Sequence, residues 1–324
     1  MSLYPLKFNP IIQERIWGGN KLKRSLNKKA SFIGAGESWE LSGVSENVSV
    51  LANGPLHGTS LAFLIESHKE DLLGPTVYEV FGNEFPVLIK FIDAAQDLSI
   101  QVHPNESLAQ ARHNCPGKNE MWYVMEATPE ARLIVGFKEG VDQALYEEKL
   151  EGQVLETILE QHKVKQGDTF YIETGTIHAI GAGVLLAEIQ QTSDVTYRVY
   201  DFNRKDAAGK SRALHTEAAL SALDFKHKVN YKTSYTQDLN RANPMVESPY
   251  FVTNYLPVKG KYKVSGDLKA SFRIYICVKG SGEISNAFGN EHIGYGETVL
   301  MAACSEFIEI ESPAGALFLE VYYP

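Results

Sequence analysis

The chain has 324 residues, of which 44% are hydrophobic and 22% are charged. This is the composition of a folded protein of about two domains, and it excludes wholesale disorder. The formal net charge of −9 argues against nucleic acid or an anionic membrane as a partner, because either would be repelled. The longest apolar runs are much shorter than the ~20 residues of a membrane-spanning helix. With three cysteines and no recognisable leader, the chain is predicted to be cytoplasmic.

Most of the periodic pattern is typical of short strands. Runs of β-branched and aromatic residues, bounded by Gly, Pro, Asn or Asp, predict strands at 48–53, 85–92, 121–127, 131–137, 168–174, 184–190, 250–256, 271–278, 297–303 and 315–323. Apolar spacings of three and four residues predict helices at 60–74, 106–113, 141–162 and 216–225. Because these helices do not alternate regularly with the strands, the chain is predicted to be mainly β, and a jelly roll or barrel is favoured over a doubly wound sheet.

A short internal repeat predicts two related β units. Residues 167–172 and 296–301 share a Gly, an acidic residue and a Thr, followed by a strand and a small-residue turn. This turn resembles the cupin pattern, so the expected fold is two cupin-type jelly-roll barrels with a few inserted helices. The polar stretch 236–244 separates the units. The predicted domains are therefore 1–240, with the helical insertions, and 241–324.

Four residues of the first unit have side chains suited to a divalent metal. Gln101 and His103 lie two residues apart on a predicted strand, so both side chains leave the same face. Glu120 begins another strand, and His178 lies one strand beyond the Gly-acid-Thr turn. Zinc accepts imidazole, carboxylate and amide donors. Each residue alone is more often structural, but together they fall where the strands of a cupin converge.

The second repeat lacks such a donor. Phe307 follows its Gly-acid-Thr turn at the same distance as His178 follows the first. Phenylalanine cannot bind a metal, so we expect one metal per chain, held in the first domain. The second domain is expected to be metal-free, with a packed interior.

Seven sequence blocks are spread over residues 8–204: FNPIIQERIWGGNKL, GESWELSG, LIKFIDA, LSIQVHP, GKNEMWYV, GTIHAIGAG and EIQQTSDVTYRVYDFNR. Together they resemble the type I mannose-6-phosphate isomerases, zinc-dependent cupins, and in particular their shorter bacterial branch. The resemblance implies an enzyme that interconverts mannose 6-phosphate and fructose 6-phosphate. It also implies a phosphorylated hexose as substrate and one Zn²⁺ per chain as cofactor.

The resemblance further implies roles for individual positions. The positions that match the zinc ligands are Gln101, His103, Glu120 and His178. Arg198 matches an active-site arginine, and Lys90 and Lys118 match lysines of the substrate pocket. Arg204 stands where longer relatives have a pocket lysine, so it matches by charge alone.

The chemistry of an aldose–ketose interconversion agrees with these roles. A proton moves between adjacent carbons through an enediol, and negative charge develops on the sugar oxygens. A divalent cation and the guanidinium of Arg198 suit that charge, and two lysines suit a phosphate dianion. A solvated strand edge is the alternative for both lysines, and it explains Lys118 almost equally well. Glu188 is the first choice for the proton-transferring base and Asp194 the second, because burial in an apolar strand would raise the pKa of Glu188. An ion pair with Arg198 would explain Glu188 equally well.

Two other functions fit part of the pattern. Two histidines and one carboxylate in a cupin also resemble the facial triad of a non-haem iron dioxygenase. A cupin that binds a sugar phosphate without converting it is the second alternative. Gln101, Lys90 and Arg198 favour a phosphosugar over an apolar oxidation substrate. The binding-only function would predict an incomplete catalytic constellation or an appended effector domain, and neither is visible in the sequence.

Overall fold

The computed structural model describes residues 3–32, 34–206, 208–264 and 266–324, and its strands pair antiparallel. A six-stranded sheet has the order β1 (Ile11–Gly19), β2 (Ala35–Leu41), β3 (Val87–Ala94), β10 (Val184–Gln191), β5 (Glu120–Ala127), β8 (Thr169–Ile172). A five-stranded sheet has the order β11 (Tyr197–Tyr200), β4 (Ile100–Val102), β9 (His178–Ile180), β6 (Arg132–Phe137), β7 (Leu159–Lys163).

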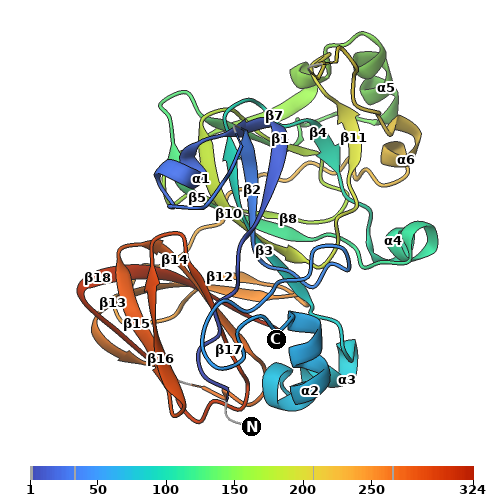
Figure 1. Cartoon of the computed structure of the whole chain (residues 1–324). Coiled ribbons are helices and arrows are strands. Elements are labelled where there is room, and N and C mark those ends of the chain that lie inside the picture. Colours follow the sequence, from blue (N-terminus) through green and yellow to red (C-terminus); the bar gives the residue numbers. More distant parts are fainter. Residues whose placement is uncertain (1–2, 33, 207, 265) are drawn as a thin grey trace.

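A third, seven-stranded sheet forms the other half of the molecule (Figure 1). Its strands are β12 (Asn243–Glu247), β13 (Val252–Lys263), β18 (Glu309–Tyr322), β14 (Arg273–Lys279) and β17 (Thr298–Met301) in that order, with β15 (Ser281–Asn286) pairing β16 (Gly289–Gly294) and β18. The prediction of a mainly β, antiparallel fold of the cupin type is confirmed. The three sheets stay open within the described ranges, rather than closing into barrels.

The helices lie outside the sheets. They are α1 (Lys21–Arg24), α2 (Leu61–Leu73), α3 (Pro75–Phe81), α4 (Glu106–His113), α5 (Gln143–Glu151) and α6 (Thr216–Leu220), with a 3₁₀ turn η1 (Leu155–Ile158). Helices α5 and α6 pack on the outer face of the five-stranded sheet, whereas α2 and α3 lie beside the seven-stranded sheet (Figure 1). Among the described residues no helix is long and apolar enough to span a membrane.

The six- and five-stranded sheets pack face to face. Trp122 and Val124 of β5 and Leu186 of β10 point into the space between them and meet Leu133 and Val135 of β6. The intervening residues of β5 and β10 point the other way and are buried as well. A strand buried on both faces has a nearly continuous apolar sequence, which is why 184–190 is so clear a strand signal.

The outer face of the six-stranded sheet packs against the seven-stranded sheet. Phe91 of β3 and Ile189 of β10 share one core with Ile276 of β14 and Leu319 of β18. Near the N-terminus, Leu6 exchanges two backbone hydrogen bonds with Leu300, each 2.9 Å long. The two predicted domains are therefore joined by a common core. The domain boundary at residue 240, just before β12, stays a prediction.

The internal repeat corresponds to two equivalent turns. Gly167 precedes β8 with φ +89°, and Gly296 precedes β17 with φ +80°. Both values lie in the left-handed region, where a side chain would be strained. The same Gly-acid-Thr sequence thus makes the same entry into a strand in each half of the molecule.

Two sequence predictions of secondary structure are wrong. The helix predicted at 141–162 ends at Glu151, where Gly152 comes next, and after η1 the chain becomes β7, paired with β6. The strand predicted at 48–53 is limited to isolated bridges, because Val50 and Leu51 pair with single residues of separate segments.

Candidate metal centre

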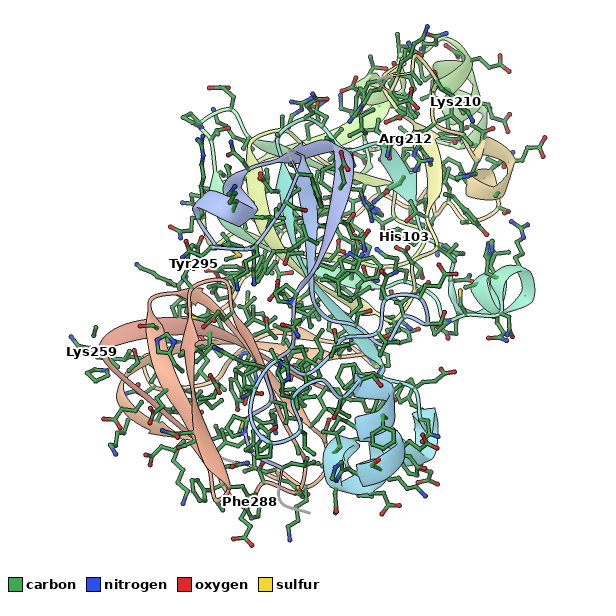
Figure 2. All side chains as sticks on the ribbon, viewed as in Figure 1. His103, Lys210, Arg212, Lys259, Phe288 and Tyr295 are labelled. Atoms are coloured by element: carbon green, nitrogen blue, oxygen red, sulfur yellow. The ribbon has the colours of Figure 1, made fainter. Side chains whose placement is uncertain are left out.

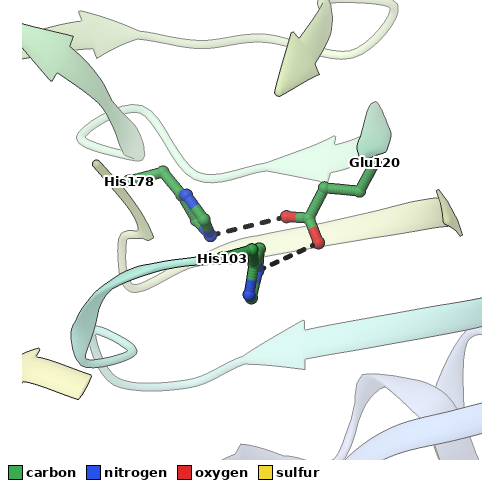
Figure 3. Close-up of side chains that lie close together, drawn as sticks. All are labelled: His103, Glu120 and His178. Atoms are coloured by element: carbon green, nitrogen blue, oxygen red, sulfur yellow. Dashed lines mark ion pairs between the residues drawn. The ribbon is translucent and has the colours of Figure 1, made fainter. Parts of the chain in front are cut away.

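Three side chains of types that can bind a metal meet between the two packed sheets (Figure 3). His103 follows β4, Glu120 begins β5, and His178 begins β9. Nε2 of His103 lies 3.3 Å from Oε2 of Glu120, and Nε2 of His178 lies 3.5 Å from Oε1 of the same carboxylate. All three are buried, and their ligand atoms lie within 4.8 Å of one another. A group of this kind could hold a metal ion.

Both imidazole rings turn Nε2 toward Glu120. Nδ1 of His103 lies 3.0 Å from the carbonyl oxygen of Val195, and Nδ1 of His178 lies 2.8 Å from that of Thr176. A carbonyl oxygen only accepts hydrogen bonds, so Nδ1 carries the proton in each neutral ring and Nε2 presents a lone pair. Histidines that bind metals are commonly held in this way.

The electrostatics of the group match the protonation states that metal ligands need. Burial lowers the pKa of His103 to about 3, and burial also lowers the pKa of His178. Burial raises the pKa of Glu120, but its interactions with neighbouring groups, the charge of Lys118 first among them, outweigh burial, so the pKa lies well below its usual range. At neutral pH the rings are therefore neutral and the carboxylate is ionised.

Gln101 and Lys118 contact this group directly. The Lys118 ammonium pairs with Oε2 of Glu120 and lies 3.1 Å from Nε2 of His103. The side-chain nitrogen of Gln101 lies 3.2 Å from Nε2 of His178, so the amide turns its nitrogen, not its oxygen, toward the ring. Oε1 of Glu120 is buried and accepts no hydrogen bond from the described residues. A buried oxygen without a donor, beside two imidazole lone pairs, fits a divalent cation.

Strand pairing explains why these residues meet. On the five-stranded sheet, Arg198 of β11 pairs with Gln101 of β4, which pairs with His178 of β9. The three side chains thus follow one another across adjacent strands. This register brings residues from three distant parts of the chain into one row.

A second row crosses the six-stranded sheet. Trp39 of β2 pairs with Lys90 of β3, Lys90 pairs with Glu188 of β10, and Glu188 pairs with Trp122 of β5. The Lys90 ammonium lies 4.7 Å from the centre of the Trp39 ring. The row therefore places one buried cation and one buried carboxylate between two tryptophans.

Both rows border one cavity of about 560 Å³. Its lining includes the predicted site residues Lys90, Gln101, Lys118, Glu188, Asp194 and Arg198. A cavity of this size suits a small-molecule ligand. Figure 2 labels Arg212, which also lines the cavity, and His103 of the metal centre.

Glu188 is bound by Lys90 and Trp122. Its Oε1 lies 3.5 Å from the Lys90 nitrogen, and its Oε2 accepts a hydrogen bond of 3.0 Å from Nε1 of Trp122. Burial and the charge of Glu120 raise the pKa of Glu188. In the structure Glu188 therefore pairs with Lys90, and not with Arg198 as the sequence analysis had considered.

The two predicted arginines differ in placement. Arg198 lines the cavity and donates from Nη1 to the carbonyl oxygen of Ala213 at 2.8 Å, while burial and the nearby Arg212 lower its pKa. Arg204 lies outside the described lining. Its guanidinium donates to the carbonyl oxygen of Asp97 and lies 3.5 Å from the carboxylate of Asp201. The structure thus brings Arg198, but not Arg204, to the cavity wall.

Glu37 is one of the carboxylates of the cavity that the sequence analysis did not single out. It receives hydrogen bonds of 2.9 and 3.0 Å from Arg15 and one of 2.7 Å from Nε1 of Trp39. Burial raises the pKa of Glu37, but the charges of Lys90 and Arg15 outweigh it and lower the pKa overall. Glu37 and Trp39 are two residues apart on β2, the same spacing that singled out Gln101 and His103, so the signal was available.

The chain is similar in sequence and in structure to mannose-6-phosphate isomerases. Residues 5–139 match the family profile "Phosphomannose isomerase type I, catalytic domain". The chain is 35% identical over 288 residues to a probable mannose-6-phosphate isomerase of Bacillus subtilis, covering 87% of this chain and 88% of that protein. It is also 35% identical to the mannose-6-phosphate isomerase of Streptococcus mutans, covering 87% of each. A crystal structure of the Bacillus subtilis mannose 6-phosphate isomerase superposes with a TM-score of 0.89 at 30% identity, covering 99% of this chain and 100% of that one.

Proposed function

Because the chain belongs to the type I phosphomannose isomerase family, we propose that it interconverts mannose 6-phosphate and fructose 6-phosphate at the cavity described above. One observation carries the proposal. A buried group of two histidines and a glutamate lies beside a cavity that also presents Glu188 and Arg198. These are the parts that an aldose–ketose isomerase acting through a cis-enediol needs.

We propose that the metal is one Zn²⁺ per chain. Its ligands would be Gln101, His103, Glu120 and His178. Gln101 would contribute its amide oxygen after rotation of the amide, which in the structure turns its nitrogen toward His178. Neutral imidazoles, an ionised carboxylate and a buried oxygen that accepts no hydrogen bond from the described residues support this assignment. When bound, the cation would polarise the sugar oxygens and offset the negative charge of the enediol.

Glu188 is the proposed base that moves the proton between the two sugar carbons. Its carboxylate lines the cavity, and its raised pKa brings it closer to the range useful for proton transfer near neutral pH. Lys90 and Trp122 hold the carboxylate in place. Asp194 also lines the cavity and is the second choice for this role.

Arg198 is proposed to stabilise the charge that develops on the sugar oxygens. Its side chain is oriented by the carbonyl oxygen of Ala213, and its Nε is buried without a partner among the described residues. A guanidinium carries its charge at any pH the enzyme meets, and its planar fork can donate to two oxygens at once. An oriented donor of this type lowers the barrier without reorganising.

The phosphate group is proposed to bind to the cationic part of the cavity. Lys90 and Lys118 both line it. Lys90 forms an ion pair with Glu188, and Lys118 forms one with Glu120. Arg204 has less support in this role, because Asp97 and Asp201 bind its guanidinium outside the described lining. The contact of Arg204 with substrate stays a prediction.

The cytoplasmic location also stays a prediction, which the three free cysteines favour.

A coupled assay tests the proposed function. The purified chain is given mannose 6-phosphate, fructose 6-phosphate is followed enzymatically, and the assay is repeated after a chelator and after zinc is returned. We expect turnover that the chelator abolishes and zinc restores. Oxygen uptake without isomerisation would instead identify a dioxygenase, and binding without turnover would identify a sugar-phosphate-binding protein.

A further inference from the structure

Asn119 lies between Lys118 and Glu120, and all of its polar groups are bonded. Its backbone nitrogen and side-chain nitrogen both donate to Oε1 of Gln191, at 2.9 and 2.8 Å. Its carbonyl oxygen accepts from the backbone nitrogen of Gln191 at 3.1 Å, and its Oδ1 accepts from the backbone nitrogen of Thr174 at 3.1 Å. Both amide side chains are buried, with exposed fractions of 5% and 6%.

We call the hydrogen bonds of Asn119 with Gln191 and Thr174 the clip. A further contact extends the clip toward the surface. Nε2 of Gln191 donates to Oε2 of Glu106 at 3.2 Å, and the backbone nitrogen of Gly117 donates to the same oxygen at 3.0 Å. Glu106 is the first residue of α4. The segment 117–120 is therefore fastened at Gly117 by Glu106 and at Asn119 by Gln191.

The clip joins three segments that each carry a residue of the candidate site. Asn119 is flanked by Lys118 and Glu120, Thr174 lies in the turn before His178, and Gln191 is on the same strand as Glu188. In extended backbone, the two neighbours of a residue point away from its own side chain. Asn119 thus faces the clip while both flanking side chains face the metal centre.

We propose that Asn119 and Gln191 are positioning residues that hold the Glu120 carboxylate where a metal can bind it; the inference rests on the metal centre of the proposed function. A buried amide that loses its partner pays a desolvation cost, so the clip favours a single arrangement of the segment. Neither side chain belongs to the described lining of the cavity. Their effect on metal binding therefore acts through Glu120.

The test uses Asn119→Ala and Gln191→Met in the full chain. Asn119→Ala removes the bonds to Gln191 and Thr174, whereas Gln191→Met keeps a similar volume and removes the side-chain acceptor and donor. Zinc dissociation constants are measured by competition with a chromophoric chelator, alongside melting temperature and steady-state kinetics. Zinc should bind about 10- to 100-fold more weakly, as for other groups that support metal ligands. At saturating zinc the KM should stay close to wild type.

Asn243→Ala is the matched control. Asn243 is also a buried amide, and its Nδ2 donates to the carbonyl oxygens of Asp238, Arg241 and Tyr255 beside the seven-stranded sheet. It should lower the melting temperature and leave zinc affinity unchanged. Wild-type zinc affinity in Gln191→Met and in a folded Asn119→Ala, or an equal loss in Asn243→Ala, would overturn the proposal. A wild-type chain that binds zinc but does not isomerise would overturn the proposed function alone.

Discussion

At the scale of single residues, Arg198 separates catalysis from metal binding most cleanly. A cationic guanidinium cannot ligate a metal, so Arg198→Ala should leave zinc content unchanged. It should lower kcat and kcat/KM together by a factor of about 10² to 10³, as when one oriented donor to a developing oxyanion is lost. Arg198→Lys should recover little, because a point charge lacks the planar fork.

The control for Arg198 is structural. Its Nη1 is bound to the carbonyl oxygen of Ala213 and its backbone nitrogen to Nδ1 of His215, and only the first bond is lost on substitution. Melting temperature and zinc content are therefore measured on the same preparation. Unchanged kcat, or a loss explained by unfolding, would refute the catalytic role.

At the scale of elements, the row of side chains across β2, β3, β10 and β5 sets the charge state of Glu188. Lys90 and Trp122 both lower the pKa of Glu188, while burial and Glu120 raise it. Lys90→Met should therefore raise that pKa and move the acid limb of the kcat/KM profile to higher pH, because the base must be ionised. Trp122→Phe should move it in the same direction. The check is a pH–rate profile of each variant; an acid limb at the wild-type pH would exclude Glu188 as the base.

Some of these strands, and the place of two site residues, could be predicted from the sequence, whereas the strand pairing could not. Alternation and turn residues predicted β3, β5 and β10, and the spacing of Gln101 and His103 placed both beside the metal centre. The pairing of β11 with β4 and of β4 with β9 could not be predicted, because register depends on contacts between distant segments. The helix predicted at 141–162 stops early because Gln153, just after the C-cap Gly152, has φ +56°, and the later residues 159–163 pair with β6.

At the scale of the whole molecule, the shared core between the six- and seven-stranded sheets predicts that the two halves unfold together. Ile276 and Leu319 would lose part of their apolar surroundings if the second half were separated, because they belong to one core with Phe91 and Ile189. We expect one unfolding transition for the full chain and no cooperative transition for the fragment 241–324. Circular dichroism on both checks this. Two separate transitions, or a folded fragment, would show that the division at residue 240 separates independent domains.

The buried histidines make the stability of the metal-free protein depend on pH. An unfolded histidine binds a proton near pH 6.5, whereas burial lowers the pKa of folded His103 to about 3. Between these values the unfolded state binds more protons, so the free energy of unfolding falls as the pH falls. The slope is at most about 1.4 kcal/mol per pH unit for one histidine. Urea unfolding between pH 7 and pH 4.5 should show a flatter dependence in His103→Gln; equal slopes would contradict the neutral, buried state of His103.

His103, Glu120 and His178 are proposed to hold one metal on which isomerisation depends. The most direct test is to strip the purified chain with a chelator, add back zinc in measured steps, and follow fructose 6-phosphate formation at each step. Activity should rise in proportion to zinc and stop rising at one equivalent per chain, and His178→Ala should regain none. Full activity in the stripped protein, or wild-type zinc occupancy and activity in His178→Ala, would contradict the proposed metal site.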